Sequence, residues 1–199
     1  MKKFIAILAL LFITASCVEA TVISFGAGTI VATRNKSLSD TKDDVIIAAK
    51  IDKEFLVNGL KTPRNSVEVM VSEGRVLITG EIRDLQKGKK AVEIIWKIKG
   101  VKELIDEVEI KKEDLRIADF GGVISDTYLT SKIKTKLFFN RKVSLADYKI
   151  SSFNHSVYLL GIAKDRAEID EVLRVISKTS GIKKVVNHVI LANDSRRNG

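Results

Sequence analysis

The stretch Val76-Leu77-Ile78-Thr79-Gly80 recurs 81 positions later as Val157-Tyr158-Leu159-Leu160-Gly161. The same offset relates Gly100-Val101-Lys102 to Gly181-Ile182-Lys183, so apolar runs and turn glycines keep a common spacing. Such a spacing indicates a duplicated folding unit of roughly 65 residues. Because a unit of this size is only marginally stable alone, we expect the two copies to pack against each other.

A helix is predicted at the start of each copy. Asp43-Asp44 and Ser125-Asp126-Thr127 are residue types that cap helix N-termini, and each precedes an apolar stripe. The stripes recur every four residues, as one buried helix face requires. They consist of Ile47, Ile51 and Phe55 in the first copy and of Leu129, Ile133 and Leu137 in the second.

A hairpin of two short strands is predicted after each of these helices. The first strand of the first hairpin alternates apolar and polar residues, and a polar turn separates the two strands of each hairpin. The first hairpin comprises residues 67–71 and 75–80 around Ser72-Glu73-Gly74, and the second comprises residues 149–151 and 156–161 around Phe153-Asn154-His155.

A second helix and a third strand complete each copy. The helices are predicted over residues 84–99 and 165–179, and each is followed by a glycine that can end a helix. The strands are predicted over residues 101–110 and 182–191. The sequence therefore predicts an α+β fold with two tandem domains of order α-β-β-α-β. In each domain two helices pack on one face of a small three-stranded sheet.

The N-terminus has the pattern of a bacterial secretory signal over residues 1–16. Lys2-Lys3 precede an apolar run from residue 4 to residue 13, and Thr14-Ala15-Ser16 follow as a small-residue site. Ten apolar residues extend about 15 Å as a helix, half of a bilayer core, so the run is too short for a transmembrane helix.

The chain has one cysteine, Cys17, which excludes an internal disulfide. Ile13-Thr14-Ala15-Ser16-Cys17 resembles a bacterial lipobox, which implies lipidation of Cys17 and, because Val18 follows, transfer to the outer membrane. Two or three acyl chains anchor a protein stably. The alternative is that Val18-Glu19-Ala20 directs cleavage before Thr21, which would leave a soluble periplasmic protein.

Charge is distributed unequally between the copies. Residues 44–110 contain 12 basic and 12 acidic side chains, whereas residues 125–191 contain 12 and 6. This asymmetry predicts an acidic partner for the second copy, either an anionic membrane or a nucleic acid. Export argues against nucleic acid, and the basic stretch lacks the Arg, Asn and Gln set that reads bases. The other interpretation is that the charge difference between the copies arose by neutral drift of surface residues.

The first helix of the second copy is the candidate site. Between Thr127 and Ala146 it contains five basic residues and no acid, and Tyr128, Lys132, Thr135 and Phe139 form a stripe beside the core stripe. An exposed face of aromatic and basic residues suits an anionic membrane interface. The alternative is that Tyr128 and Phe139 are buried against the first domain. The candidate phospholipid-binding residues are Tyr128, Lys132, Lys134, Lys136, Phe139, Arg141 and Lys142.

These elements carry a family resemblance. The element order, the hairpin return Gly74-Arg75-Val76-Leu77-Ile78-Thr79-Gly80 and the stretch Asp126-Thr127-Tyr128-Leu129-Thr130-Ser131-Lys132-Ile133 resemble the BON domain. Two such domains behind a lipobox resemble the dual-BON outer-membrane lipoproteins of the DolP or YraP group. The second copy departs from the family pattern at Ser156, where glycine is usual.

The resemblance implies a non-enzymatic periplasmic lipoprotein that supports envelope integrity. Its second domain would bind anionic phospholipid through its first helix, and the resemblance also implies association with the outer-membrane assembly machinery. The alternative function is a periplasmic adaptor that docks an acidic protein on the same basic face. The predicted divisions are a signal peptide (1–16), a lipidated N-terminus and tether (17–42), domain one (43–111), a linker (112–124), domain two (125–192) and a polar tail (193–199).

Few residues favour catalysis, a cofactor or a metal site. His155 lies in a predicted turn and His188 on the last strand, without the spacing that joins histidines to further ligands. Trp96 is expected in the core or in an interface. The acidic residues of the third strand of copy one mostly alternate, as on a solvated strand or an edge strand. They are Glu103, Asp106, Glu107 and Glu109.

Overall fold

The structure is a computed structural model, and it describes residues 38–62, 65–111 and 117–198. The predicted signal peptide, Cys17 and the tether up to residue 37 lie outside the described residues. All of the elements below belong to one compact unit, Thr33–Gly199. Within the described residues, no helix has both the length and the apolar character that crossing a bilayer requires.

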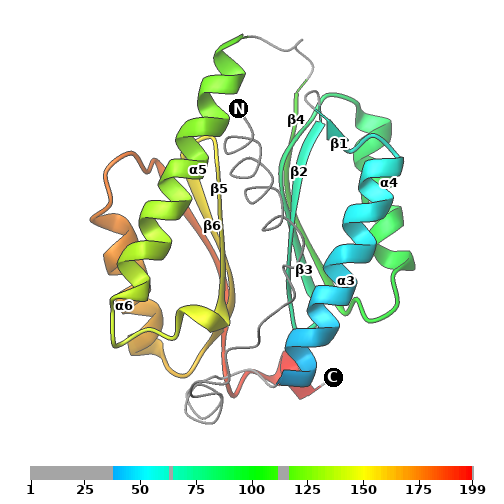
Figure 1. Cartoon of the computed structure of the whole chain (residues 1–199). Helices are drawn as coiled ribbons and strands as arrows, with labels where there is room; N and C mark the ends of the chain where they lie inside the picture. The colour runs from blue at the N-terminus through cyan, green and yellow to red at the C-terminus, as the bar shows by residue number, and fades with distance from the viewer. Residues whose placement is uncertain (1–37, 63–64, 112–116, 199) are drawn as a thin grey trace, which may run out of the picture. The chain divides into compact units, whose positions relative to one another are not determined.

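The first domain places two helices on one face of a mixed sheet (Figure 1). Its strand order is β1-β2-β3-β4, with β2 and β3 antiparallel and β3 and β4 parallel. The sheet has four strands rather than the predicted three, because a two-residue strand pairs with β2. The elements are α3 (Leu38–Val57), β1 (Lys61–Thr62), β2 (Asn65–Ser72), β3 (Arg75–Ile82), α4 (Leu85–Lys97) and β4 (Glu103–Ile110).

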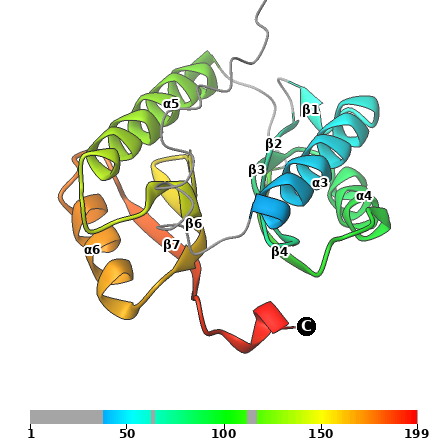
Figure 2. The same cartoon turned by 60° about the horizontal axis from the view of Figure 1, so that its bottom comes forward.

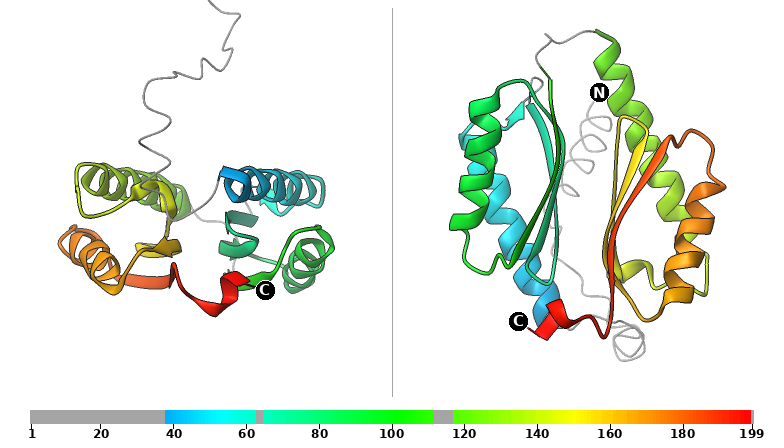
Figure 3. Two further views of the ribbon diagram at one scale, coloured as in Figure 1. Left: turned by 90° about the horizontal axis from the view of Figure 1, so that it is seen from below. Right: turned by 180° about the vertical axis from the view of Figure 1, so that it is seen from behind.

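The second domain repeats this arrangement, with its two helices again on one face of the sheet (Figure 2; Figure 3). Its three strands have the order β5-β6-β7, antiparallel and then parallel. The elements are α5 (Ile117–Phe138), η1 (Leu145–Asp147), β5 (Tyr148–Phe153), β6 (Ser156–Ala163), α6 (Arg166–Ser177), β7 (Lys184–Leu191) and η2 (Ser195–Asn198).

The predicted apolar stripes of α3 and α5 form the centres of the two cores. Ile51 and Phe55 on α3, and Ile133 and Leu137 on α5, are completely buried. The second helices begin as predicted, because the Asp84 and Asp165 carboxylates accept backbone N–H bonds from the first turns of α4 and α6. The fold class predicted from the sequence is thus confirmed.

The first helix of each domain begins earlier than predicted. α3 starts at Leu38 and α5 at Ile117, inside the stretches assigned to the tether and the linker. Asp44 and Asp126 are therefore not N-caps. Each carboxylate instead accepts two backbone N–H bonds from the hairpin turn of its own domain, Asp44 at 2.8 and 2.9 Å and Asp126 at 2.6 and 2.9 Å.

The two hairpin turns have the same backbone geometry. Glu73 and Gly74 have φ of 53° and 78°, and Asn154 and His155 have φ of 49° and 62°. Two successive positive φ values are typical of a type I′ turn, which favours glycine at its second position. The residue of the second domain that replaces the family's glycine is therefore His155, and the prediction that placed this departure at Ser156 is wrong.

A third apolar cluster joins residues of both sheets. Met70 and Leu77 of the first domain are buried together with Tyr158 and Leu160 of the second. Polar contacts accompany the cluster, including a hydrogen bond from Ser151 to Glu68 and one of 2.9 Å between His188 Nε2 and Glu107 Oε1. The expectation that the two copies pack against each other is confirmed.

Candidate functional site

The side of α5 that faces away from the core carries exposed aromatic rings. Because Leu129, Ile133 and Leu137 occupy the core side of the helix, neighbouring positions a third of a turn away face solvent. Tyr128 is 67% exposed and Phe139 is 76% exposed. The alternative interpretation, in which both rings are buried against the first domain, is therefore wrong.

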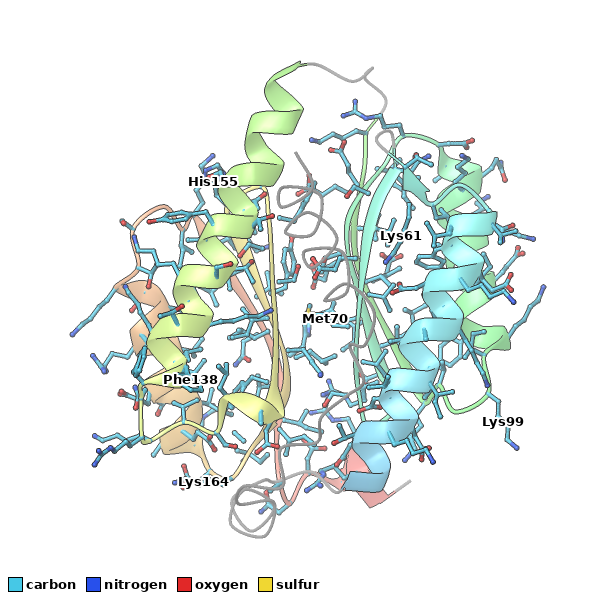
Figure 4. The ribbon with its side chains drawn as sticks, viewed as in Figure 1. Lys61, Met70, Lys99, Phe138, His155 and Lys164 are labelled. Atoms are coloured by element: carbon cyan, nitrogen blue, oxygen red, sulfur yellow. The ribbon has the colours of Figure 1, made fainter. Side chains whose placement is uncertain are left out.

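A second phenylalanine belongs to this surface and was missed in the sequence analysis. Phe138 is 71% exposed, and its ring lies edge to face with that of Phe139, at 5.2 Å between centroids and 83° between planes. Figure 4 shows Phe138 at the end of α5. The sequence contained the information to predict its exposure, because the core stripe ends at Leu137 and the two residues that follow then face away from the core. Two adjacent exposed rings are uncommon on a surface that contacts only water.

The two lysines nearest these rings keep their charge uncompensated. Lys132 Nζ lies 5.8 Å from the centre of the Tyr128 ring and 3.2 Å from Ser180 Oγ. Lys136 Nζ donates to Thr179 Oγ1 at 2.8 Å. Within the described part of the chain, neither ammonium group pairs with a carboxylate. These contacts position the cations without neutralising them.

An open hollow of about 500 Å³ lies where the C-terminal end of α5 meets α6. It contains five basic side chains and one aromatic ring, and both helices contribute to it. Its lining consists of Lys136, Phe139, Asn140, Arg141, Lys142, Arg174, Val175 and Lys178. A basic hollow beside exposed rings can bind an anionic group whose attached chain is apolar.

Glu171 is the acidic residue beside this hollow, and it neutralises one of the five cations. Its carboxylate accepts bonds from Arg174 Nε at 2.7 Å and Nη2 at 2.6 Å, and from Asn140 Nδ2 at 2.6 Å. The Arg174 bonds, followed by the Asn140 bond, lower the pKa of Glu171 from 4.5 to about 2. Glu171 therefore stays ionised at neutral pH and offsets the Arg174 charge, while the other four cations remain.

The structure does not bring all of the predicted residues together. Tyr128, Lys132, Lys136 and Phe139 share one side of α5, and Arg141 and Lys142 follow at its end. Lys134 lies elsewhere and lines a different hollow together with Tyr148 and Lys149. Successive residues of a helix are rotated by about 100°, so Lys134 points away from both Lys132 and Lys136. We call the surface formed by Tyr128, Lys132, Phe138, Phe139 and the basic hollow the α5 surface.

The other residues singled out from the sequence lie outside the α5 surface. His155 Nε2 lies 3.5 Å from Ser125 Oγ, and His188 contacts Glu107. Among the described residues, no group of three or more His, Cys, Asp or Glu side chains is arranged to hold a metal ion. The acidic strand β4 is an edge strand, as predicted. Trp96 is 54% exposed on α4, so its expected place in the core is wrong.

Comparison with known proteins agrees with the duplication. The BON domain family matches residues 43–112 and again residues 125–193. An uncharacterised protein of Anaplasma centrale, named for its place in the gshII 5′ region, is 31% identical over 155 residues, which cover 78% of this chain and 99% of that protein.

Two further relatives have descriptive names. The outer membrane lipoprotein DolP of Haemophilus influenzae is 25% identical over 186 residues, covering 94% of each chain. A 21 kDa hemolysin of Actinobacillus pleuropneumoniae is 22% identical over 151 residues, covering 76% of this chain and 75% of that protein. The similarity to these relatives extends across both copies of the repeat.

Proposed function

Because the chain belongs to the BON-domain family and contains the domain twice, we propose that it is a lipid-anchored protein of the outer membrane whose second domain binds anionic phospholipid. The α5 surface is the proposed binding site, and Cys17 is the proposed point of lipid attachment. The similarity to an outer membrane lipoprotein along 94% of the chain supports the proposed location. The proposed role is to bind and support the envelope, without a chemical reaction.

One observation carries the lipid proposal. Among the described residues, four cations without carboxylate partners and the exposed rings of Phe138 and Phe139 lie at the C-terminal end of α5, and the exposed Tyr128 ring lies on the same helix beside Lys132. Aromatic rings are favoured at the level of lipid headgroups, while lysine and arginine extend to the phosphates. Each basic residue near an anionic membrane contributes about 1 kcal/mol, so four of them add substantially to a lipid anchor.

The twin helix of the first domain lacks this combination. α3 carries Asp52 and Glu54 where α5 carries Lys134 and Lys136, and Leu56-Val57 where α5 carries Phe138-Phe139. Leu56 and Val57 are exposed like their aromatic counterparts. The two helices thus share a fold position but differ in charge and in aromatic content, which supports assignment of the lipid contact to the second domain.

The proposal is tested by vesicle binding of the chain that begins at Thr33. This chain contains both cores and omits the apolar run of residues 4–13 and Cys17, so that only the folded domains can bind. We expect it to sediment with vesicles that contain phosphatidylglycerol and to remain free with phosphatidylcholine alone. Replacing Arg141 and Lys142 by glutamine should lower the affinity about thirtyfold, since two cations are lost.

Lys183→Gln with Lys184→Gln provides the matched control. Both lysines are exposed in the same domain, but they precede or begin β7 and lie outside the α5 surface. This control should bind nearly as well as the unaltered chain. Equal binding to neutral and anionic vesicles, or equal losses in the two double variants, would show that the α5 surface does not recognise lipid and would favour the acidic protein partner instead.

Removing the acid beside the hollow should have the opposite effect. In Glu171→Gln the amide oxygen can still accept the Asn140 bond, but the Arg174 charge is no longer neutralised. One additional cation should raise affinity for anionic vesicles about fivefold. Titration of the vesicles followed by sedimentation measures this gain, and an unchanged or lower affinity would argue against a phosphate contact in the hollow.

A further inference from the structure

The first domain carries an exposed apolar and basic stripe on its second helix. Leu85, Lys89, Val92 and Trp96 recur along α4 at the spacing of one helix face. Leu85 is 57% exposed, Trp96 is 54% exposed, and Lys89 is also exposed, while Val92 is half-buried. α4 therefore presents to solvent a tryptophan and a leucine separated by about three helical turns.

The orientation of α4 is determined by its opposite face. Ala91, Ile94 and Ile95 are buried in the core of the first domain. The Asp84 carboxylate caps the helix by accepting the Gln86 N–H bond at 2.8 Å. The core contacts and the cap together keep the stripe on the outside, so Trp96 is not available to the domain's own core.

The charge around this stripe is strongly positive although the domain as a whole is balanced. Residues 85–102 contain six lysines and one acid, Glu93, because the acidic side chains of the domain lie mainly on α3, the hairpin and β4. Among the described residues, none of the four exposed lysines beside Trp96 forms an ion pair. They are Lys89, Lys90, Lys97 and Lys99. Figure 4 shows Lys99 projecting away from the domain.

We infer that α4 is a second contact for an anionic phospholipid surface, with Trp96 placed at headgroup level. Charge complementarity requires an anionic partner, and the indole ring prefers the boundary between headgroups and acyl chains. A lipid surface is favoured over nucleic acid or an acidic peptide because all of the cations are lysines, on α4 or just after its end. Lysine is a hydrated point charge, whereas arginine is the residue favoured for bidentate recognition.

This contact is separate from the α5 surface, and each can exist without the other. Trp96 is the single tryptophan of the chain, so its fluorescence reports on α4 alone. In the chain that begins at Thr33, vesicles of phosphatidylglycerol should shift Trp96 emission to shorter wavelength. Vesicles of phosphatidylcholine should leave the emission unchanged. Brominated acyl chains in the anionic vesicles should quench the shifted emission.

Variants separate the two surfaces. In the Arg141→Gln, Lys142→Gln background, the shift of Trp96 should persist at higher lipid concentration. Adding Lys89→Gln and Lys97→Gln to that background should lower the remaining affinity about thirtyfold. The matched control, Lys50→Gln with Lys53→Gln on α3, removes two exposed lysines of the same domain away from the stripe and should have a much smaller effect.

Three results would overturn the inference. Trp96 emission that stays unshifted while the chain is bound to anionic vesicles would show that α4 remains in water. Equal losses in the α4 variant and the α3 control would show that only net charge matters. A shift produced by polyglutamate, but not by vesicles, would assign α4 to an acidic protein. The second and third results do not depend on whether the α5 surface binds lipid.

Discussion

Gly80→Ala is expected to destabilise the first domain by roughly 3–5 kcal/mol, which places it among the most damaging single substitutions. Gly80 ends the apolar run of β3 with φ of 112°, a conformation that L side chains rarely adopt. A Cβ at this position would lie 1.9 Å from the Ser66 carbonyl oxygen on β2. Strand β2 would have to move away, and part of the β2–β3 ladder would be lost.

Urea unfolding of the chain that begins at Thr33 measures this loss. Trp96 belongs to the first domain, so its emission follows that domain directly. Gly122→Ala is the matched control, because Gly122 lies in α5 with nothing within 4 Å of an added Cβ. The control should leave the Trp96 transition of the first domain unchanged, because the added methyl group acts only on α5, where alanine has the higher helix propensity. If Gly80→Ala unfolded at the same urea concentration as the unaltered chain, the close approach of strand β2 to position 80 would be contradicted.

Asp126→Ala is expected to cost the second domain about 3 kcal/mol, because two backbone N–H groups lose a charged acceptor. Those groups belong to Asn154 and His155, whose positive φ values are already unfavourable for residues other than glycine. Without the carboxylate, the turn loses the two hydrogen bonds that offset that strain. Thermal unfolding followed by circular dichroism should show an earlier transition of the second domain.

Two further variants test the mechanism of this loss. Asp126→Asn retains one acceptor oxygen and should lose about half as much stability as Asp126→Ala. Asp170→Ala removes an exposed carboxylate of the same domain and should unfold like the unaltered chain. Equal losses for Asp126→Ala and Asp170→Ala would mean that the Asp126 carboxylate does not hold the hairpin.

The order of the helices and strands could be predicted because the sequence contains the folding unit twice. Each structural requirement of the unit therefore appears at two equivalent positions. Gly80 and Gly161 occur in both copies because a Cβ at either position would meet backbone, the Ser66 carbonyl oxygen of β2 at 1.9 Å and the Asp147 carbonyl oxygen just before β5 at 2.2 Å. The core stripes of α3 and α5 were identified correctly for the same reason. A requirement present in both copies is therefore visible without an alignment of relatives.

The N-termini of α3 and α5 could not be predicted, because an aspartate before an apolar stripe has two physical uses. It can cap its own helix or it can accept bonds from a distant turn, and the sequence pattern is the same for both. Asp84 and Asp165 cap α4 and α6, whereas Asp44 and Asp126 hold hairpins 30 or so residues away. That choice depends on tertiary contacts.

The α5 surface was only partly predictable. The helical spacing correctly placed Tyr128, Lys132 and Phe139 outside the core. The run of basic residues grouped Lys134 with them, although Lys134 faces another side of the helix. The contribution of α6 was also missed, because Arg174 and Lys178 come from a segment far along the chain. Trp96 was expected in the core or in an interface, and the structure shows that it is exposed on α4.

The most direct test of the central proposal is the depth of the α5 surface in a membrane. Two single-tryptophan chains, each carrying Trp96→Phe, are compared: one with Phe139→Trp and one with Val57→Trp at the twin position of α3. On vesicles of phosphatidylglycerol with brominated acyl chains, the tryptophan at position 139 should be strongly quenched and the one at position 57 should not. Equal quenching at both positions, or quenching at position 57 alone, would contradict the assignment of the lipid contact to α5.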